Sequence, residues 1–251
     1  MSDAVLETRN LNKNFGALEV TQNINFSLNP GARHAIIGPN GAGKTTLVNL
    51  LTGVLRPSAG AVFLGGDDIT SMSENERVKH GIARTFQINT LFKGLSVLDN
   101  LYLAITERFG GATEMFRPAG HDIKVQEQAL RTLTTLKLEE NALTVVRELP
   151  YGRQRLVELA IALALDPKVL LLDEPAAGVP SAESHIILDA VDNLPEGIAV
   201  LIIEHDMDVV FRFAKRISVL VRGSIMAEGD PEEIATNPEV QAVYLGEADH
   251  V

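Results

Sequence analysis

Apolar and polar positions alternate near the start of the chain, over residues 5–9 and 24–28, as they do in half-buried β-strands. Residues 33–37 (RHAII) form a short apolar run, which is followed by a glycine-rich turn and by a helical stretch that ends at Gly53. Residues 61–64 (AVFL) predict a further strand. We therefore expect a β-rich N-terminal region that leads into a strand–turn–helix unit.

From about residue 87 to residue 148 the spacing of apolar positions becomes helical, with few strand-like runs. Four leucines indicate an amphipathic helix in this stretch: Leu130, Leu133, Leu136 and Leu138. A second helix is predicted over residues 153–165 (RQRLVELAIALAL), and it is apolar nearly all round from Leu156. A helix of that kind should be buried.

Continuous apolar runs at 169–172 and 199–203 have the composition of strands that are buried on both faces. Because helices separate them, they indicate a parallel sheet covered by helices on both sides. Residues 217–221 and 224–227, joined by Arg222-Gly223, return to β-structure before a polar helical tail. The pattern as a whole predicts an α/β fold with a helical insertion.

Composition narrows the function classes. Lys and Arg number 22 against 33 for Asp and Glu, a formal net charge of −11 that argues against a general nucleic-acid binder. The absence of cysteine excludes disulfides and thiolate metal sites. The longest apolar runs, such as 198–203, are far shorter than a bilayer span, and the N-terminus lacks the layout of a secretory signal. We expect a cytosolic or peripheral protein.

A phosphate-binding loop is predicted between the strand at 33–37 and the helix that follows it. The pattern G-x-x-x-x-G-K-[ST] is matched by Gly38, Pro39, Asn40, Gly41, Ala42, Gly43, Lys44 and Thr45. Glycines let backbone N–H groups point inward around a phosphate, and the helix N-terminus adds its positive end. Lys44 can reach the β- and γ-oxygens, and the Thr45 hydroxyl can bind Mg²⁺. The alternative is an ordinary glycine-rich turn, and the strand before the motif and the helix after it make that the weaker interpretation.

Two carboxylates follow the strand at 169–172. Asp173 would lie beside the phosphate loop at the carboxyl edge of a parallel sheet, where it can hold Mg²⁺ directly or through water. Glu174 comes next, points differently, and can polarise an attacking water. Acidic residues that merely close a strand are the alternative, and the phosphate loop makes it the weaker one.

With these residues in place, the chain resembles the ATP-binding subunits of ABC transporters over essentially its whole length, and within them the ATPases of branched-chain amino acid importers. The segments that carry the resemblance are GPNGAGKTTL, ARTFQINTLFKGLSVLDN, LPYGRQRLVELAIALALDPKVLLLDEPAAG, LIIEHDM and MAEGDPEEIATNPEVQAVYLGE. The resemblance implies one ABC ATPase domain over 1–251. It implies a RecA-like P-loop NTPase core with an N-terminal antiparallel β region at 1–87 and 150–251, and an inserted α-helical subdomain at 88–149.

The resemblance also implies roles for individual residues. ATP would bind at residues 38–46, which adds Thr46 to the loop, with Mg²⁺ held by Thr45, Gln87 and Asp173. Phe15 would stack on adenine, although an aromatic residue in a β-sheet core is the alternative. Gln87 would sense the γ-phosphate and His205 would contact it, beside Glu174 and Lys44 as catalytic groups. A surface glutamine and a structural histidine are the alternatives. Residues 91–100 would lie near the surface that meets the membrane subunits, although a core stretch explains their leucines equally well.

Two positions depart from the family pattern. The signature segment, Leu-Ser-Gly-Gly-Gln in the family, reads Leu149, Pro150, Tyr151, Gly152 and Arg153 here. Pro150 removes a hydroxyl and an N–H that would face the ATP of the partner subunit. The Gly152 N–H and the helix dipole remain. Arg153 or Arg155 supplies a substitute cation, or both are solvated. Pro180 replaces the Asn or Asp that helps to couple the two sites.

These features imply the ATPase motor of an importer, working with a second ATP-binding subunit, two membrane-spanning permease subunits and, indirectly, an external substrate-binding protein. It would sit peripherally at the cytoplasmic face of the cell membrane, with ATP and Mg²⁺ as its ligands and without nucleic acid. The departures favour an asymmetric heterodimer over a homodimer. The alternatives are a nucleotide-binding regulatory subunit with one degenerate site, a soluble ABC ATPase not coupled to transport, and a GTP-specific enzyme, whose N-K-x-D motif is absent. Branched-chain amino acids are the substrate by analogy, and urea, amides or aromatic acids remain open.

Overall fold

The computed structural model describes residues 4–85, 91–108, 123–175, 177–179 and 181–248. Its central element is a six-stranded sheet of order β10-β9-β3-β8-β7-β6, parallel except for β10. The strands are β3 (Arg33–Ile37), β6 (Ile82–Thr85), β7 (Val169–Asp173), β8 (Ala199–Ile203), β9 (Arg216–Val221) and β10 (Ser224–Gly229). A second, antiparallel sheet has the order β2-β1-β4-β5. Its strands are β1 (Leu6–Phe15), β2 (Leu18–Leu28), β4 (Ala59–Leu64) and β5 (Asp67–Asp68).

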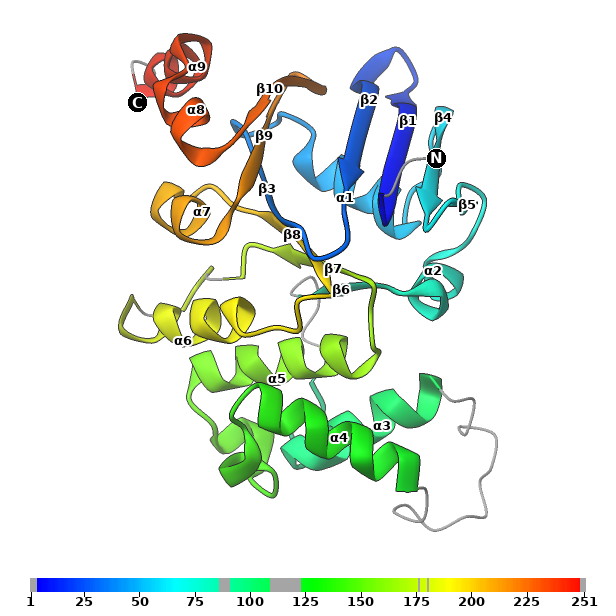
Figure 1. Cartoon of the computed structure of the whole chain (residues 1–251), viewed down its shortest axis with the longest axis vertical. Helices are drawn as coiled ribbons and strands as arrows, with labels where there is room; N and C mark the ends of the chain where they lie inside the picture. The colour runs from blue at the N-terminus through cyan, green and yellow to red at the C-terminus, as the bar shows by residue number, and fades with distance from the viewer. Residues whose placement is uncertain (1–3, 86–90, 109–122, 176, 180, 249–251) are drawn as a thin grey trace.

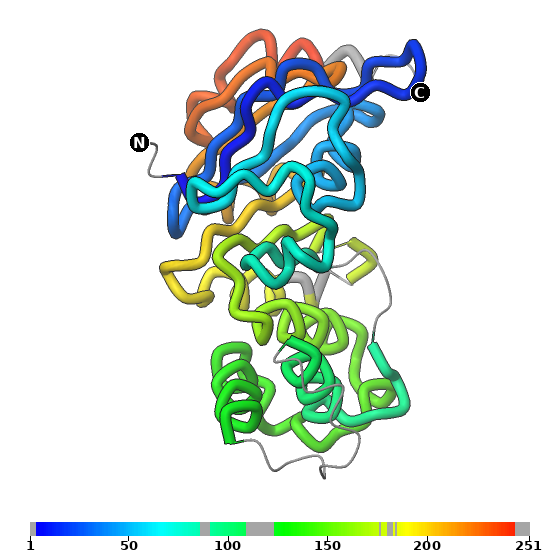
Figure 2. The backbone as a smooth tube through the Cα atoms, turned by 90° about the vertical axis from the view of Figure 1, so that its right-hand side faces the viewer, coloured from blue at the N-terminus to red at the C-terminus, as the bar shows by residue number. Residues whose placement is uncertain are grey.

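Helices pack against both faces of the six-stranded sheet, and two of them pack beyond that layer. They are α1 (Lys44–Thr52), α2 (Glu74–His80), α3 (Val97–Arg108), α4 (Ile123–Thr135), α5 (Tyr151–Ala164), α6 (Ser181–Asp192), α7 (Met207–Phe213), α8 (Pro231–Thr236) and α9 (Pro238–Ala248), with 3₁₀ turns at Glu139–Asn141 and Val146–Glu148. Figures 1 and 2 show α3, α4 and α5 at one end of the molecule and the antiparallel sheet at the other. None of the helices in the described ranges is long and apolar enough to span a bilayer.

Alternate residues of the central strands point into two separate cores. On β7, Leu170 and Leu172 pack with the helices α3 to α7, whereas Val169 and Leu171 pack with α1 and the antiparallel sheet. This two-sided burial is why the strands read as continuous apolar runs. It confirms the parallel, doubly covered sheet that the sequence predicts.

Several predicted boundaries match the structure. The strands at 33–37 and 199–203 coincide with β3 and β8, and α1 ends at Gly53, whose φ of 84° is the usual left-handed helix stop. Arg222 and Gly223 both have positive φ, 47° and 82°, as the two-residue hairpin between β9 and β10 requires.

The predicted amphipathic helix is present as α4 but ends earlier than expected, and one strand of the central sheet has no counterpart in the sequence prediction. The amphipathic helix with four leucines ends at Thr135, because Lys137 takes a left-handed φ of 54° and Leu138 N bonds back to Leu133 O (2.9 Å). Leu136 and Leu138 are buried beyond that helix end, while Leu130 is 59% exposed. The strand β6 was not foreseen, since its four residues include Arg84 and precede the start of the helical pattern.

A buried histidine links β3 to β9 and β10. The Nε2 of His34 lies 2.8 Å from Ser218 Oγ, which donates to Glu228 Oε2 at 2.7 Å, and the ring meets Phe26 edge-on at 4.9 Å between centroids. Burial lowers the pKa of His34 to about 4 from 6.5. The ring is therefore neutral in the folded protein at neutral pH.

This depressed pKa predicts acid sensitivity. Below pH 6.5 the His34 ring binds a proton in the unfolded chain, whereas in the folded chain it stays neutral down to about pH 4. The free energy of unfolding should therefore fall as the pH drops through this window, by about 2 kcal/mol between pH 7 and pH 5 from this group alone. Urea unfolding of the protein and of His34→Gln at both pH values measures it. Equal losses in the two proteins would contradict the assignment.

Candidate functional site

The glycine-rich loop lies between β3 and α1, at the carboxyl edge of the parallel sheet, where ligands of open α/β sheets bind. Gly38 and Gly43 have φ of 154° and 102°. A Cβ on Gly38 would fall on the carbonyl oxygen of Leu220, and one on Gly43 would lie 2.7 Å from Val20 O. Only glycine fits at these two positions, so the spacing of the motif follows from the close approach of β2 and β9.

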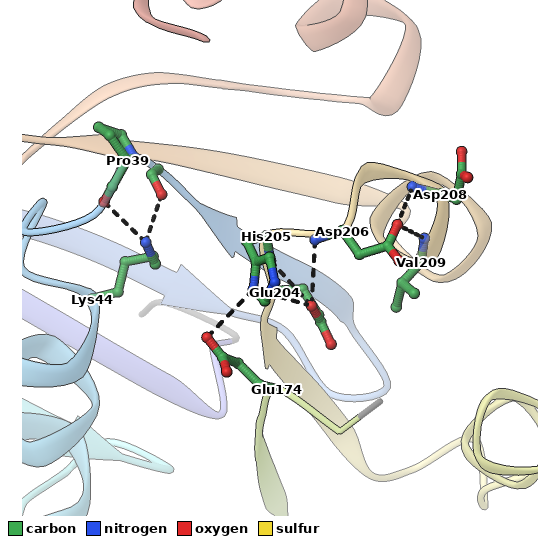
Figure 3. Close-up of polar contacts among 9 residues, drawn as sticks. Pro39, Lys44, Glu174, Glu204, His205, Asp206, Asp208 and Val209 are labelled. Atoms are coloured by element: carbon green, nitrogen blue, oxygen red, sulfur yellow. Dashed lines mark hydrogen bonds and ion pairs between the residues drawn. The ribbon is translucent and has the colours of Figure 1, made fainter. Parts of the chain in front are cut away.

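Positive charge is concentrated at this loop. The Lys44 Nζ donates to the carbonyl oxygens of Gly38 (2.5 Å) and Pro39 (3.0 Å), as Figure 3 shows. The N-terminus of α1 begins at the same residue and adds its partial positive charge. Thr45 is exposed and Thr46 half-buried, so the Thr45 hydroxyl is accessible to a ligand. The remaining loop residues are Asn40, Gly41 and Ala42, of which Asn40 is exposed and Ala42 buried. The arrangement suits a polyphosphate anion.

A carboxylate and an imidazole lie at the carboxyl ends of β7 and β8, at the same edge of the sheet as the loop. Glu174 follows β7 and is 46% exposed, and its Oε1 lies 3.4 Å from Nδ1 of His205, which follows β8 (Figure 3). The φ of Glu174 is 48°, a left-handed conformation that costs energy in a non-glycine residue. The two predicted catalytic side chains are thus brought together.

Asp173, the last residue of β7, is held by a residue that the sequence reasoning missed. The Nη2 of Arg84 lies 2.6 Å from Asp173 Oδ2, and both side chains are largely buried. A second missed residue is Glu204, 2% exposed, which accepts from the backbone N–H groups of His205 (3.1 Å) and Asp206 (3.4 Å). No local pattern pointed to Arg84, because the strand β6 was not foreseen, whereas the acid directly before His205 was the signal for Glu204.

Phe15 lies at the end of β1, and 49% of it is exposed. The alternative interpretation, a phenylalanine buried in the core of the β-sheet, is therefore wrong. Phe15 pairs with Leu18 on β2, two residues before Val20, whose carbonyl touches the phosphate loop. Lys13 Nζ lies 5.1 Å from the centre of its ring. An accessible aromatic face beside the loop is compatible with stacking on a base.

The signature segment forms the start of α5. Leu149 is buried, Pro150 is the residue that caps the helix, and Tyr151 is 42% exposed. The Gly152 N–H donates to Glu183 Oε2 at 2.8 Å, so a carboxylate takes the hydrogen bond that the sequence suggested for a phosphate. Arg153 donates to Lys137 O at 3.1 Å.

Arg155 is engaged within its own helix, because it pairs with Glu158 at 2.7 Å and lies over the Tyr151 ring. The predictions for Gln87 and Pro180 concern positions outside the described residues.

The donor set fits Mg²⁺ that arrives with a nucleotide. In the described ranges no group of three or more His, Cys, Asp or Glu side chains could hold a metal ion alone. The Thr45 hydroxyl and the Asp173 carboxylate are hard oxygen ligands, which Mg²⁺ prefers together with phosphate oxygens and water. The chain has no cysteine, and the part of it that the structure describes holds no histidine cluster that would bind a softer metal.

Comparisons with known proteins agree with this site. A family model described as ABC transporter matches residues 21–177, and one described as branched-chain amino acid ATP-binding cassette transporter matches residues 224–250. The chain is 38% identical to a probable branched-chain amino acid transport ATP-binding protein LivG of Archaeoglobus fulgidus, covering 98% of this chain and 96% of the relative. It is 36% identical to the high-affinity branched-chain amino acid transport ATP-binding protein LivG of Escherichia coli strain K12. That alignment covers 99% of this chain and 100% of the relative.

Solved structures show the same fold. The ADP conformation of an ATP-binding cassette of an ABC transporter superposes with a TM-score of 0.86 at 34% identity, covering 98% of this chain and all of that one. A dimeric ATP-binding cassette in a post-hydrolysis state, bound to ADP and Pi, gives a TM-score of 0.72 at 26% identity. That superposition covers 90% of this chain and 98% of the cassette. The predicted α/β fold class is confirmed, and with it ATPase activity as the chemistry of the family. The chain belongs to the ATP-binding subunits of ABC transporters, and within them to the branched-chain amino acid branch.

Proposed function

We propose that this chain is the ATP-hydrolysing motor of an ABC importer for branched-chain amino acids or related small polar compounds. The observation that carries the proposal is the meeting of the phosphate loop, Asp173, Glu174 and His205 at one edge of the sheet, in a chain that matches such subunits over its full length. The experiment is ATP-driven uptake in vesicles that contain the assembled complex, with Glu174→Gln as the inactive form. Uptake that survives the substitution would contradict the proposal.

The proposed chemistry is in-line transfer of the γ-phosphoryl group to water. Lys44 neutralises phosphate charge, and the exposed carboxylate of Glu174 takes the proton of the attacking water. His205 fixes the orientation of that carboxylate from 3.4 Å away. Thr45 and Asp173 would hold Mg²⁺, which when bound neutralises charge on the β- and γ-phosphates. Gln87 and Phe15 would complete the γ-phosphate and adenine contacts.

The assembly is proposed from the same residues. Two ATP-binding subunits would close head-to-tail over two nucleotides, on two membrane-spanning permease subunits fed by an external binding protein. The chain would be peripheral at the cytoplasmic face of the membrane. Its helical subdomain, proposed for residues 88–149 within the single domain 1–251, would be the part nearest those subunits. The core would comprise residues 1–87 and 150–251.

The signature segment supports an asymmetric heterodimer. ATP bound to this chain would be hydrolysed, whereas ATP bound to the partner subunit, which this chain's signature segment faces, would be hydrolysed slowly or not at all. Pro150 provides neither hydroxyl nor N–H there, and Glu183 already accepts the Gly152 N–H. The same observation favours a second candidate, a regulatory subunit that completes one degenerate site.

Restoring the hydroxyl tests the asymmetry. In the assembled complex, with this chain's own site blocked by Glu174→Gln, Pro150→Ser should raise the remaining turnover about tenfold, because one hydrogen bond to a charged group is gained. Pro150→Ala, which restores only the N–H, should give a smaller rise. No gain from serine would count against the asymmetric arrangement.

A further inference from the structure

Arg84 is the one residue of β6 with a charged side chain, and it faces the end of β7. It pairs in register with Leu171, so Asp173, two residues further along β7, lies on the same face of the sheet. Its Nη2 donates to Asp173 Oδ2 at 2.6 Å, and its Nη1 donates to Asn49 Oδ1 at 2.7 Å. The Arg84 side chain is only 8% exposed and that of Asp173 18%.

The two hydrogen bonds connect two separate elements of the proposed Mg²⁺ site. Asn49 lies four residues after Thr45 on α1, so both side chains are on one face of that helix. The guanidinium therefore connects the Asp173 carboxylate to the helix face that carries the Thr45 hydroxyl. A planar fork of donors can hold both partners at once, which a lysine ammonium on a flexible stem does poorly.

The pair leaves half of the carboxylate available. Arg84 binds Oδ2, so Oδ1 of Asp173 is the oxygen that remains for the metal or for a water on it. A carboxylate without this partner would be free to change rotamer, and it would be buried without a counter-charge. Ligating carboxylates are commonly oriented by such outer hydrogen bonds, and their loss weakens metal binding.

We propose that Arg84 is a positioning residue for the magnesium–nucleotide site, which orients Asp173 and ties it to the phosphate-loop helix through Asn49. The inference rests on the proposed role of Asp173. It predicts that loss of Arg84 reduces the gain in ATP affinity that Mg²⁺ provides and leaves the ATP affinity without Mg²⁺ nearly unchanged.

The test measures binding of a fluorescent ATP analogue to the full chain, once with Mg²⁺ and once with EDTA. For Arg84→Met the tightening caused by Mg²⁺ should shrink about tenfold, while the metal-free affinity stays within about twofold of the native value. Arg84→Lys should recover only part of the loss. Asn49→Ala, which removes one of the two bonds and is the milder change for the fold, should lose part of the Mg²⁺ effect in the same direction.

Arg33→Met is the matched control. Arg33 is a half-buried arginine of β3 whose Nη1 donates to Ile198 O at 2.7 Å, near the opposite end of the strands. Its loss should lower the unfolding temperature and leave the Mg²⁺ effect unchanged.

Several outcomes would overturn the inference. Equal weakening with Mg²⁺ and with EDTA in Arg84→Met would make Arg84 a purely structural residue. An unchanged Mg²⁺ effect in Arg84→Met, while Asp173→Asn loses it, would reject the role of Arg84 and leave that of Asp173 intact. A native Mg²⁺ effect in Asp173→Asn would remove the proposed metal site and the inference with it.

Discussion

Glu174→Gln should lower steady-state ATP hydrolysis by about 10²–10⁴-fold and leave ATP binding intact, because it removes a general base and little else. The side chain is 46% exposed and its carboxylate reaches His205 at 3.4 Å, so an amide of the same shape fits without repacking. Phosphate release by the assembled complex measures turnover, and equilibrium binding of ATP measures affinity. A loss of turnover at unchanged affinity is the expected signature of a proton-accepting group.

Two comparisons make this result specific. Glu196→Gln changes an exposed carboxylate in the loop before β8, far from the phosphate loop, and should leave turnover within about twofold of the native value. His205→Gln should reduce turnover less than Glu174→Gln, since His205 acts through Glu174 and the γ-phosphate. Turnover that persists in Glu174→Gln would show that another group activates the water.

The central sheet could be predicted because its sequence signals are strong and local. The runs 33–37 and 199–203 are buried on both faces of the sheet, so the sequence predicted the exact bounds of β3 and β8. The site follows from the same logic. Parallel strands bring their carboxyl ends to one edge, so Asp173, Glu174 and His205 had to converge near Gly38.

What the sequence did not reveal depends on long-range contacts. Arg84 reads as a polar residue in a weak segment until β7 brings Asp173 beside it, 89 residues away. α4 ends because Lys137 adopts a left-handed conformation, and a lysine in the sequence does not predict that conformation. The contact between Gly152 and Glu183 joins residues 31 positions apart and changes what the signature segment offers to a phosphate. Such pairings arise from tertiary structure and leave no periodic signal.

The second large expected effect is a loss of stability, and it concerns a buried arginine that contacts the C-terminal end of the phosphate-loop helix. Arg77 on α2 is 1% exposed, and its guanidinium donates to the carbonyl oxygens of Leu50 (2.6 Å), Leu51 (2.8 Å) and Thr70 (3.0 Å). The first two carbonyls belong to the last turn of α1, whose C-terminal carbonyls have no partners within the helix. Burial lowers the pKa of Arg77 to about 10, which still leaves it charged at neutral pH. A cation at this end of α1 also complements the negative end of the helix dipole.

Arg77→Met should therefore destabilise the protein by about 3–5 kcal/mol, since it leaves three carbonyl groups, two of them fully buried, without their charged donor. For a chain of this size the unfolding temperature should fall by roughly 10 °C. Arg77→Lys keeps one charged donor and should lose less. Arg56→Met, an exposed arginine just after α1, should change the unfolding free energy by less than about 0.5 kcal/mol. If urea unfolding gave Arg77→Met and Arg56→Met the same stability, the carbonyls of α1 would have found other donors, and Arg77 would not be what secures the helix that presents Lys44 and Thr45.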